Sequence, residues 1–284
     1  MQKYYLLGSP VDHSLSPAMH NCAFRALHTE AEYRLLDVPE ADLPAVVNRL
    51  KREEAAGWNV TMPDKTAMFH LCEVLSDSAR IGHSVNTVRN EHGVLHGYTT
   101  DGDGFLLAMR DEGFPVLGAD LTLLGTGGAA ASILIACALE AAASVRVFYH
   151  QEASCRRMTE IKERLAGSAK TKIDFFPLSD FGAVRNAVRS SQVLINATSV
   201  GMANTPMADY SPLPDGIELP ERLSVFDIIY NPRTTPLLAD AKKAGCRTAN
   251  GLSMLLYQGA ESFRIWTGRE MPVDTVRRAV FPNG

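Results

Sequence analysis

The chain has 284 residues, of which 46% are hydrophobic, and this is enough apolar material for two compact domains. Its formal net charge of −4 provides no basic field for nucleic acid or anionic lipid. Five scattered cysteines without a Cys-x-x-Cys predict neither a disulfide framework nor a zinc ribbon. No apolar run is long enough to span a membrane, and the four-residue run near the N-terminus is too short for a signal peptide. We therefore expect a cytoplasmic monomer or homodimer.

The first hundred residues alternate short apolar runs with amphipathic segments, which is typical of an α/β unit. Strands are expected over 4–7, 33–38 and 58–61, and helices from about 17 and near 43–52. Another helix is expected to follow Asp101 and to end before Gly113-Phe114-Pro115, which breaks it. We place a domain boundary at this helix, so that the first domain contains residues 1–104.

The middle of the chain has the pattern of a βαβ unit. A strand over 121–124, a turn over 125–128, a helix over 129–142 and a strand over 145–149 are expected in that order. Further strands over 172–176, 193–196 and 225–229 would extend a parallel sheet, and the prolines of 205–220 predict a loop. The predicted fold class is therefore α/β with two domains, of which the second, 105–251, is a doubly wound nucleotide-binding domain.

The turn between the first strand and helix of this unit is Gly125-Thr126-Gly127-Gly128-Ala129. Glycines allow the backbone to turn tightly and approach a pyrophosphate, while the helix that follows presents unpaired N–H groups and its positive end. A strand before the glycines and an alanine-rich helix after them are the context that this motif requires. We predict a dinucleotide site here, with a ligand-free tight turn as the alternative.

The choice between NAD and NADP depends on the residues after the next strand. Glu152 lies where an acidic side chain binds both ribose hydroxyls, which favours NAD. Arg156 and Arg157 follow within one helical turn and would suit the 2′-phosphate of NADP, unless they form a solvated helix face. The sequence slightly favours NAD and leaves NADP open.

Two serines precede the first predicted helix, in Ser14-Leu15-Ser16-Pro17. Ser16 suits an N-cap and Pro17 suits the first helical position, so both hydroxyls are expected beside a positive helix end. Such a place favours a small anion such as a carboxylate. The alternative is that Ser16 is only a cap and that Ser14 only turns the chain.

Lys65 and Asp101 are each expected at the start of a helix. The partial positive charge of a helix N-terminus disfavours an ammonium at Lys65, which suits a proton carrier, and it favours the ionised carboxylate at Asp101. Taken singly, a solvated lysine and a helix cap are the simpler interpretations. Together with the serine pair and the dinucleotide turn, they predict an alcohol/ketone oxidoreductase.

The spacing of His92-x-x-x-His96 resembles that of metal ligands on a helix. Glu91-His92-Gly93 predicts a hairpin turn instead, and a turn removes the shared face that the spacing needs. We predict no metal site.

The combined motifs resemble the shikimate dehydrogenase family, which includes quinate/shikimate dehydrogenases, over essentially the whole chain. The resemblance is carried by Ser14-Leu15-Ser16-Pro17, Asn59-Val60-Thr61-Met62-Pro63-x-Lys65, Val85-Asn86-Thr87, Thr100-Asp101-Gly102, Gly125-x-Gly127-Gly128-Ala129, Asn196 to Met202, Tyr230-Asn231-Pro232, Thr235-Pro236-Leu237-Leu238, and Gly251-Leu252 through Gln258. It implies the reversible NAD(P)-dependent reduction of 3-dehydroshikimate to shikimate, in the biosynthesis of chorismate and the aromatic amino acids, or the parallel oxidation of quinate.

The resemblance also implies roles for individual residues. Lys65 would exchange the proton at the reacting oxygen, with Asp101 beside it. The substrate would be held by Ser14 and Ser16 at its carboxylate, by Thr61, Asn86, Asp101 and Gln258 at its hydroxyls, and by Tyr230 on the carboxylate side. Besides the glycine turn, Thr198, Ile228 and Gly251 would lie near the cofactor. The C-terminal helices of 252–284 would complete the first domain, as the substrate-binding catalytic domain.

The chain departs from the family pattern at several positions. Thr99 and Asp64 replace more usual residues, and Tyr149-His150-Gln151 replaces the Asn-Arg-Thr pattern associated with NADP. The tail, Gln258-Gly259-Ala260-Glu261 with Trp266-Thr267-Gly268, resembles the quinate/shikimate branch. Two further interpretations stay open: an oxidoreductase for a folate or tRNA-linked substrate, and a dinucleotide-binding regulatory module without catalysis.

Overall fold

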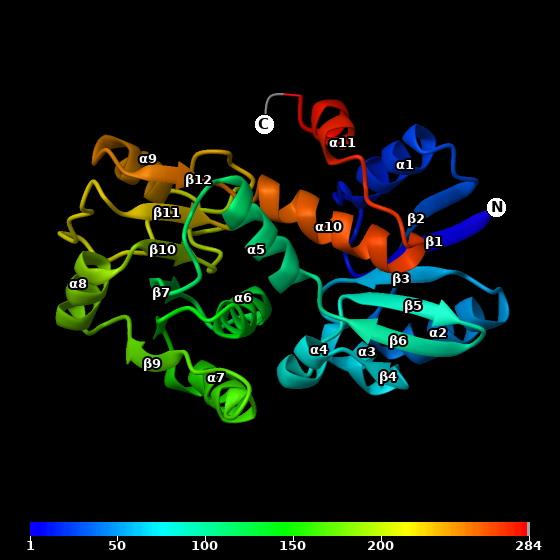
Figure 1. The fold of residues 1–284 in the computed structure, drawn as a ribbon, viewed down its shortest axis with the longest axis horizontal. Coiled ribbons are helices and arrows are strands. Elements are labelled where there is room, and N and C mark those ends of the chain that lie inside the picture. The colour runs from blue at the N-terminus through cyan, green and yellow to red at the C-terminus, as the bar shows by residue number, and fades with distance from the viewer. Residues whose placement is uncertain (283–284) are drawn as a thin grey trace. The chain divides into compact units, whose positions relative to one another are not determined.

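The computed structural model describes residues 1–282, and the chain forms two compact units (Figure 1). The first unit joins residues 1–104 to the C-terminal segment that begins at Leu255, and the second contains Phe105–Met254. The chain leaves the first unit within α5 (Asp101–Asp111) and returns within α10 (Leu252–Thr267). The return is at Leu255 rather than at residue 252, because α10 begins in the second unit.

The first unit is built on a mixed sheet of six strands in the order β2-β1-β3-β5-β6-β4. β1 is parallel to β2 and β3, whereas β5 is antiparallel to β3 and β6. The strands are β1 (Gln2–Gly8), β2 (Ala31–Asp37), β3 (Gly57–Val60), β4 (Val74–Leu75), β5 (Thr87–Glu91) and β6 (Val94–Tyr98). The helices are α1 (Ser16–Ala26), the 3-10 helix η1 (Glu40–Asp42), α2 (Leu43–Arg52), α3 (Lys65–Leu71), α4 (Asp77–Gly82) and α11 (Val273–Val280), besides most of α10.

Both faces of this sheet are covered, so β1 is apolar on both sides. Tyr4 packs on Phe24 of α1 and on Trp266 of α10, with ring centroids 5.3 and 4.9 Å apart. Tyr5 and Leu7 point to the opposite face, because side chains alternate along a strand, and they join the core formed with α2, α3 and α4 (Figure 1). The C-terminal helix α10 is therefore part of the first unit's core.

The second unit is built on six parallel strands in the order β12-β11-β10-β7-β8-β9. Its strands are β7 (Asp120–Leu124), β8 (Ser144–Tyr149), β9 (Lys172–Pro177), β10 (Val193–Asn196), β11 (Ser224–Asp227) and β12 (Arg247–Ala249). Its helices are α6 (Gly128–Leu139), α7 (Glu152–Leu165), α8 (Phe181–Ser190) and α9 (Pro236–Lys243). The order reverses after β7, which is the doubly wound arrangement predicted from the sequence, and ligands bind such sheets at the carboxyl ends of the strands beside this reversal.

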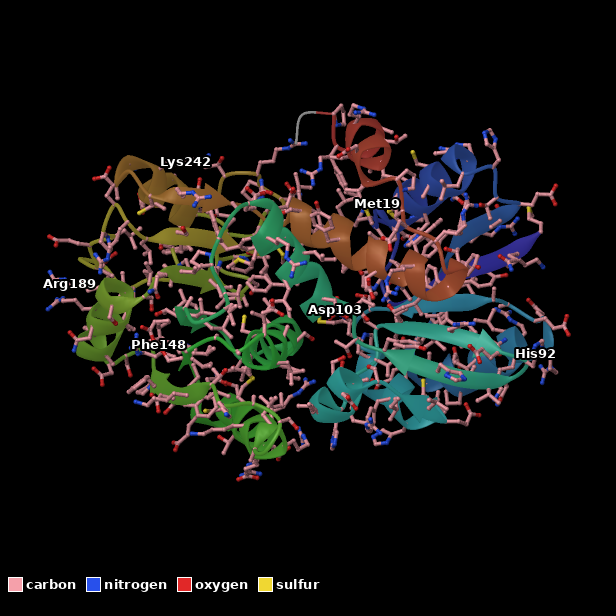
Figure 2. All side chains as sticks on the ribbon, viewed as in Figure 1. Met19, His92, Asp103, Phe148, Arg189 and Lys242 are labelled. Carbon is pink, nitrogen blue, oxygen red and sulfur yellow. The ribbon has the colours of Figure 1, made fainter. Side chains whose placement is uncertain are left out.

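Burial explains why helix α6 and the strands of the second unit are so apolar. All side chains of α6 from Ala130 to Ala138 are buried, which accounts for a helix without a polar face. Phe148 of β8, labelled in Figure 2, is 1% exposed and belongs to a core cluster that includes residues of α8 and α9. The sheet therefore forms a rigid platform for the loops at its carboxyl edge.

The expected elements are present, with two local differences. The helix expected over 129–142 ends at Leu139, because Ala141 adopts a left-handed conformation (φ 60°) and the Ala142 N–H bonds back to the Cys137 carbonyl. Ser16 is the first helical residue rather than the N-cap, which is Leu15. Among the described residues, no helix is both long and apolar enough to cross a membrane.

Candidate active site

Lys65 and Asp101 form a close ion pair in the first unit. Lys65 is the first residue of α3 and Asp101 the first residue of α5, and the Lys65 Nζ lies 2.6 Å from the Asp101 Oδ2. Their side chains are 24% and 14% exposed, so the pair is partly desolvated yet accessible. A short, charge-assisted hydrogen bond of this kind holds an ammonium in a defined place.

Asn86 fixes the other oxygen of the same carboxylate. Its Nδ2 donates to the Asp101 Oδ1 over 2.7 Å, and its Oδ1 accepts from the Thr100 backbone N–H over 2.8 Å. The Asn86 backbone is itself tied to Val60 of β3 and Tyr98 of β6. Both oxygens of Asp101 are thus engaged, and the carboxylate can hardly rotate away from Lys65.

A buried group of polar side chains lies behind Asn86 and Asp101. Thr87, Thr100 and Ser262 are each 0% exposed, and their hydroxyls lie within 3.2 Å of one another. Asn59 donates to Ser262 over 2.9 Å, and the Tyr33 hydroxyl donates to Asn59 over 2.8 Å. Sequence reasoning gave no role to Tyr33 or Ser262, although Ser262 lies one helical turn after Gln258, a spacing that places both on the same side of α10.

The hydroxyls of Ser14 and Ser16 are hydrogen-bonded to each other, and Ser16 is the first helical residue rather than the cap. The Ser14 Oγ accepts from the Ser16 backbone N–H over 3.2 Å and donates to the Ser16 Oγ over 3.1 Å. Ser16 also hydrogen-bonds Tyr33, which opposes the effect of burial that raises the pKa of Tyr33 well above its usual range. The serine pair is therefore connected, through Tyr33, to the buried polar group.

Gln258, on α10, and Thr61, after β3, both lie in the first unit. A Cβ on Gly104 would lie only 2.4 Å from the Gln258 backbone nitrogen, so the start of α5 packs directly on α10 at this residue. The Gln258 Nε2 donates to the Leu255 carbonyl over 2.9 Å. Thr61 follows β3, and its N–H bonds to the Leu7 carbonyl over 2.8 Å.

The structure satisfies the polar side chain at one of the two departures near Lys65 and Asp101, and not at the other. The Thr99 hydroxyl donates to the Ser84 carbonyl over 2.6 Å, so this buried residue is satisfied. The Asp64 carboxyl is 0% exposed, and no described residue hydrogen-bonds either of its oxygens. Burial, together with the negative charge of Glu40, raises the pKa of Asp64.

The three glycines of the turn in the second unit differ in the space around them. Gly125 adopts a φ of 109°, and a Cβ there would lie 2.8 Å from the Ala197 carbonyl oxygen. By contrast, a Cβ on Gly127 or Gly128 would meet nothing within 4 Å. The N-terminus of α6, at Gly127 and Gly128, has no side-chain cap, so no side chain competes there with a ligand for the first N–H groups of the helix.

Glu152 is the first residue of α7 and is exposed. Because β7 and β8 are parallel neighbours, the glycine turn and the start of α7 leave the sheet side by side. The Thr126 Oγ1 donates to the Ser154 Oγ over 2.8 Å, which ties the turn to the first turn of α7. This brings Glu152 to the edge of the glycine turn, and no motif of the sequence indicated the Thr126–Ser154 contact.

Asp227 organises the loops after β10 and β11. Its carboxylate accepts hydrogen bonds from Asn196 (3.0 Å), Thr235 (2.6 Å) and the Ile229 N–H (3.1 Å), while burial raises its pKa to about 6. Thr198 bonds to Asn196 as well, over 2.7 Å. Sequence reasoning missed Asp227, although a lone carboxylate at the end of an apolar strand was a signal for it.

The last predicted cofactor residues, Ile228 and Gly251, pack backbone to backbone. A Cβ on Gly251 would lie 1.8 Å from the Ile228 carbonyl oxygen, so only glycine fits there. Tyr230 follows on the same loop, where its side chain is 39% exposed and available to a ligand.

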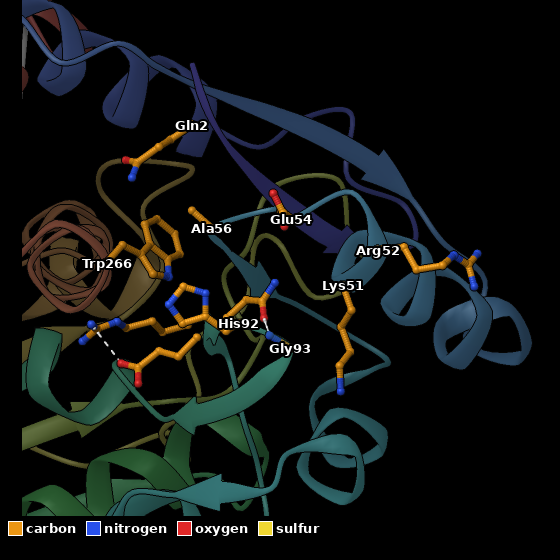
Figure 3. Close-up of a pocket in the computed structure, with 11 residues that line it drawn as sticks. Gln2, Lys51, Arg52, Glu54, Ala56, His92, Gly93 and Trp266 are labelled. Carbon is orange, nitrogen blue, oxygen red and sulfur yellow. Dashed lines mark hydrogen bonds and ion pairs between the residues drawn. The ribbon is translucent and has the colours of Figure 1, made fainter.

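A pocket of about 850 Å³ lies elsewhere in the first unit, beside the β5–β6 hairpin (Figure 3). It is lined by Lys51, Arg52, Arg89 and Trp266 among others, and none of the predicted site residues contributes to it. His92 sits at the tip of this hairpin with a φ of 54°, in the turn that the sequence predicted. Over residues 1–282, no cluster of three or more His, Cys, Asp or Glu side chains has the arrangement of a metal site.

Comparison with known proteins agrees with this geometry. Residues 6–88 match the family model of the shikimate dehydrogenase substrate binding domain, and residues 251–281 match that of the shikimate 5′-dehydrogenase C-terminal domain. A shikimate dehydrogenase (NADP(+)) of Listeria monocytogenes is 37% identical over 97% of this chain and 94% of its own length. One of Streptococcus pneumoniae is 40% identical over 95% of this chain and 93% of its own length.

The fold is shared with solved structures as well. The crystal structure of shikimate 5-dehydrogenase from Listeria monocytogenes, in complex with shikimate and NAD, superposes with a TM-score of 0.95 at 36% identity, covering 99% of this chain and 96% of the other. The paired lysine and aspartate, the dinucleotide turn and these full-length similarities lead to one conclusion: the chain belongs to the shikimate dehydrogenase family of NAD(P)-dependent oxidoreductases.

Proposed function

We propose that this enzyme reversibly reduces 3-dehydroshikimate to shikimate, with Lys65 and Asp101 as the proton relay. The observation that carries the proposal is the 2.6 Å contact between the two side chains at the starts of α3 and α5. The relatives named above support shikimate as the substrate, since one of them was crystallised with it.

The proton steps use groups that the first unit already orients. In the direction of reduction, the Lys65 ammonium donates a proton to the oxygen of the former ketone as it gains negative charge. Asp101, held by Asn86, keeps the ammonium in place and stabilises its charge before the transfer. In the opposite direction the neutral Lys65 amine accepts the proton of the alcohol.

The remaining first-unit residues would bind the substrate. Ser14 and Ser16 supply adjacent hydroxyls for its carboxylate. Thr61, Asn86, Asp101 and Gln258 would bind its hydroxyls.

The second unit would hold the dinucleotide, which supplies or accepts the hydride. Gly125 to Ala129 would bind the pyrophosphate at the N-terminus of α6, Glu152 the adenosine ribose, and Thr198, Ile228 and Gly251 the remainder. We propose NAD as the preferred form, because the exposed Glu152 carboxylate beside the glycine turn repels a 2′-phosphate. NADP use would instead rely on the exposed Arg156.

The shikimate interpretation is also favoured over quinate by the place of the C-terminal tail. Trp266, part of the segment that resembles the quinate branch, is 8% exposed, and its Nε1 donates to the Val88 carbonyl over 2.9 Å. It is a core residue, so the resemblance there reflects packing rather than substrate contact.

All five cysteines are free, which is consistent with the cytoplasmic location that we propose.

The test is an absorbance assay at 340 nm with shikimate and quinate, each with NAD and with NADP. We expect the highest kcat/KM with shikimate and NAD. Higher kcat/KM with quinate would move the enzyme to the quinate branch, and preference for NADP would transfer the ribose role from Glu152 to Arg156. Absence of turnover in all four mixtures would contradict the proposed reaction and favour the regulatory module.

A further inference from the structure

A continuous buried polar network joins the two ends of the proposed substrate site. It comprises Tyr33, Asn59, Asn86, Thr87, Thr100 and Ser262, none of which is more than 6% exposed. At one end Tyr33 contacts Ser16, and at the other Asn86 contacts Asp101. Buried polar groups are costly unless satisfied, so such a network has a specific arrangement rather than many alternatives.

Ser262 occupies the centre of this network. Its Oγ lies 2.8 Å from the Thr87 hydroxyl, 3.2 Å from the Thr100 hydroxyl and 2.9 Å from the Asn59 Nδ2. It donates its one proton to the Gln258 carbonyl over 3.0 Å, so its two lone pairs are left to accept from Asn59 and from one threonine. The hydroxyl is therefore fully used.

The contacts of Ser262 reach Asp101 through Thr100, the residue that precedes Asp101 in the chain. The Thr100 hydroxyl lies 3.2 Å from that of Ser262, and the Thr100 backbone N–H donates to Asn86, which in turn donates to the Asp101 carboxylate. Displacement of Thr100 would therefore turn the carboxylate that holds Lys65. Ser262 also fixes the carbonyl of Gln258, one turn earlier on α10, close to where α5 begins at Asp101.

We propose that Ser262 is a positioning residue for catalysis: it sets the orientation of the Asp101–Lys65 pair through Thr100 and Asn86, and ties that orientation to Gln258 on α10. This inference rests on the proposed proton relay. Ser262 itself touches neither Lys65 nor Asp101, so its effect is on the geometry of proton transfer. A residue that acts in this way changes kcat and its pH dependence more than it changes cofactor binding.

The test compares Ser262→Ala with Thr267→Val. Thr267 lies on the same helix and donates to the Phe263 carbonyl over 2.8 Å, the same bond to the preceding turn that Ser262 makes, but it is outside the network. We expect Ser262→Ala to lower kcat about tenfold, the equivalent of about one hydrogen bond, to shift the pH profile of kcat, and to leave the KM of the dinucleotide unchanged. Thr267→Val should retain wild-type kcat and pH profile at a similar loss of stability.

Thr87→Val provides a second variant of nearly unchanged volume if Ser262→Ala does not fold. It removes the hydroxyl that lies 2.8 Å from Ser262, so kcat should again fall, and where both variants fold, the double variant should lose less than the product of the single losses. Wild-type kcat and pH profile in the folded variants, or strictly multiplicative losses, would overturn the inference. If the wild-type enzyme itself failed to turn over shikimate, the proposed function would be at fault rather than the role of Ser262.

Discussion

The Lys65 ammonium and the Asp101 carboxylate meet at 2.6 Å, although 36 residues of chain separate them. Lys65 begins α3, the helix that follows β3, and Asp101 begins α5, the helix that follows β6; both strands belong to the same sheet. The sheet therefore places two helix N-termini together, and the pair depends on the tertiary structure for its contact.

Lys65→Ala should lower kcat by about 10²–10⁴-fold, the usual contribution of a general acid or base, while shikimate still binds. Calorimetric titration would measure the binding, and steady-state assays would measure kcat. Lys51→Ala is the matched control, since Lys51 lies 3.0 Å from Glu73 and is 27% exposed, close to the 24% of Lys65. Full activity in Lys65→Ala would show that another group carries the proton.

Alanine substitutions at two glycines should separate folding from cofactor binding. Gly251→Ala places a Cβ 1.8 Å from the Ile228 carbonyl oxygen and should cost at least about 2 kcal/mol of stability. Gly128→Ala meets no atom within 4 Å and should retain stability, yet its methyl enters the space proposed for the pyrophosphate. Urea denaturation and the KM of the dinucleotide are the measurements. An unchanged KM in Gly128→Ala would argue against a phosphate at this helix end.

The raised pKa of Asp227 predicts that the stability of the protein depends on pH. Because burial raises its folded-state pKa from 3.8 to about 6, the folded chain retains this proton at pH values where the unfolded chain has released it. Its contribution to stability is therefore fully present below about pH 4 and is lost as pH rises through about 6, a change on the order of 3 kcal/mol.

Asp227→Asn removes this titration while keeping the size of the side chain, so its free energy of unfolding should fall less between pH 4 and pH 7 than that of the wild type. Urea denaturation across this range would measure the difference. Asp240→Asn is the control, because Asp240 is an exposed residue of α9 paired with Lys243. Parallel curves for the wild type and Asp227→Asn would contradict the raised pKa.

Glu152→Gln should raise the KM of NAD about tenfold, because a hydrogen bond to a charged group contributes roughly 1.5–3 kcal/mol. The KM of NADP should fall, since a negative charge near the 2′-phosphate is removed. Glu160→Gln, on the same helix and in an exposed pair with Arg164, should change neither value. Equal NAD kinetics for the wild type and Glu152→Gln would remove Glu152 from the ribose site.

The sequence by itself determined the α/β class, and it predicted the dinucleotide turn and the choice of Lys65 and Asp101 as the proton relay. These are local signals: alternation of apolar runs, glycines between a strand and a helix, and residue types at helix starts. The same local signals misplaced the cap at Ser16: the N-cap is Leu15, Ser16 is the first helical residue, and its N–H donates to the Ser14 hydroxyl.

Only the tertiary structure decided how these residues are held. Ser262, Tyr33 and Asp227 carry no motif of their own, and their importance comes from partners up to 203 residues away, as between Asn59 and Ser262. Such contacts depend on strand order and on the packing of α10 against the first sheet, which periodicity does not encode. The physical reason is that a buried hydroxyl or carboxylate takes its role from the donors and acceptors around it, and the fold brings those together.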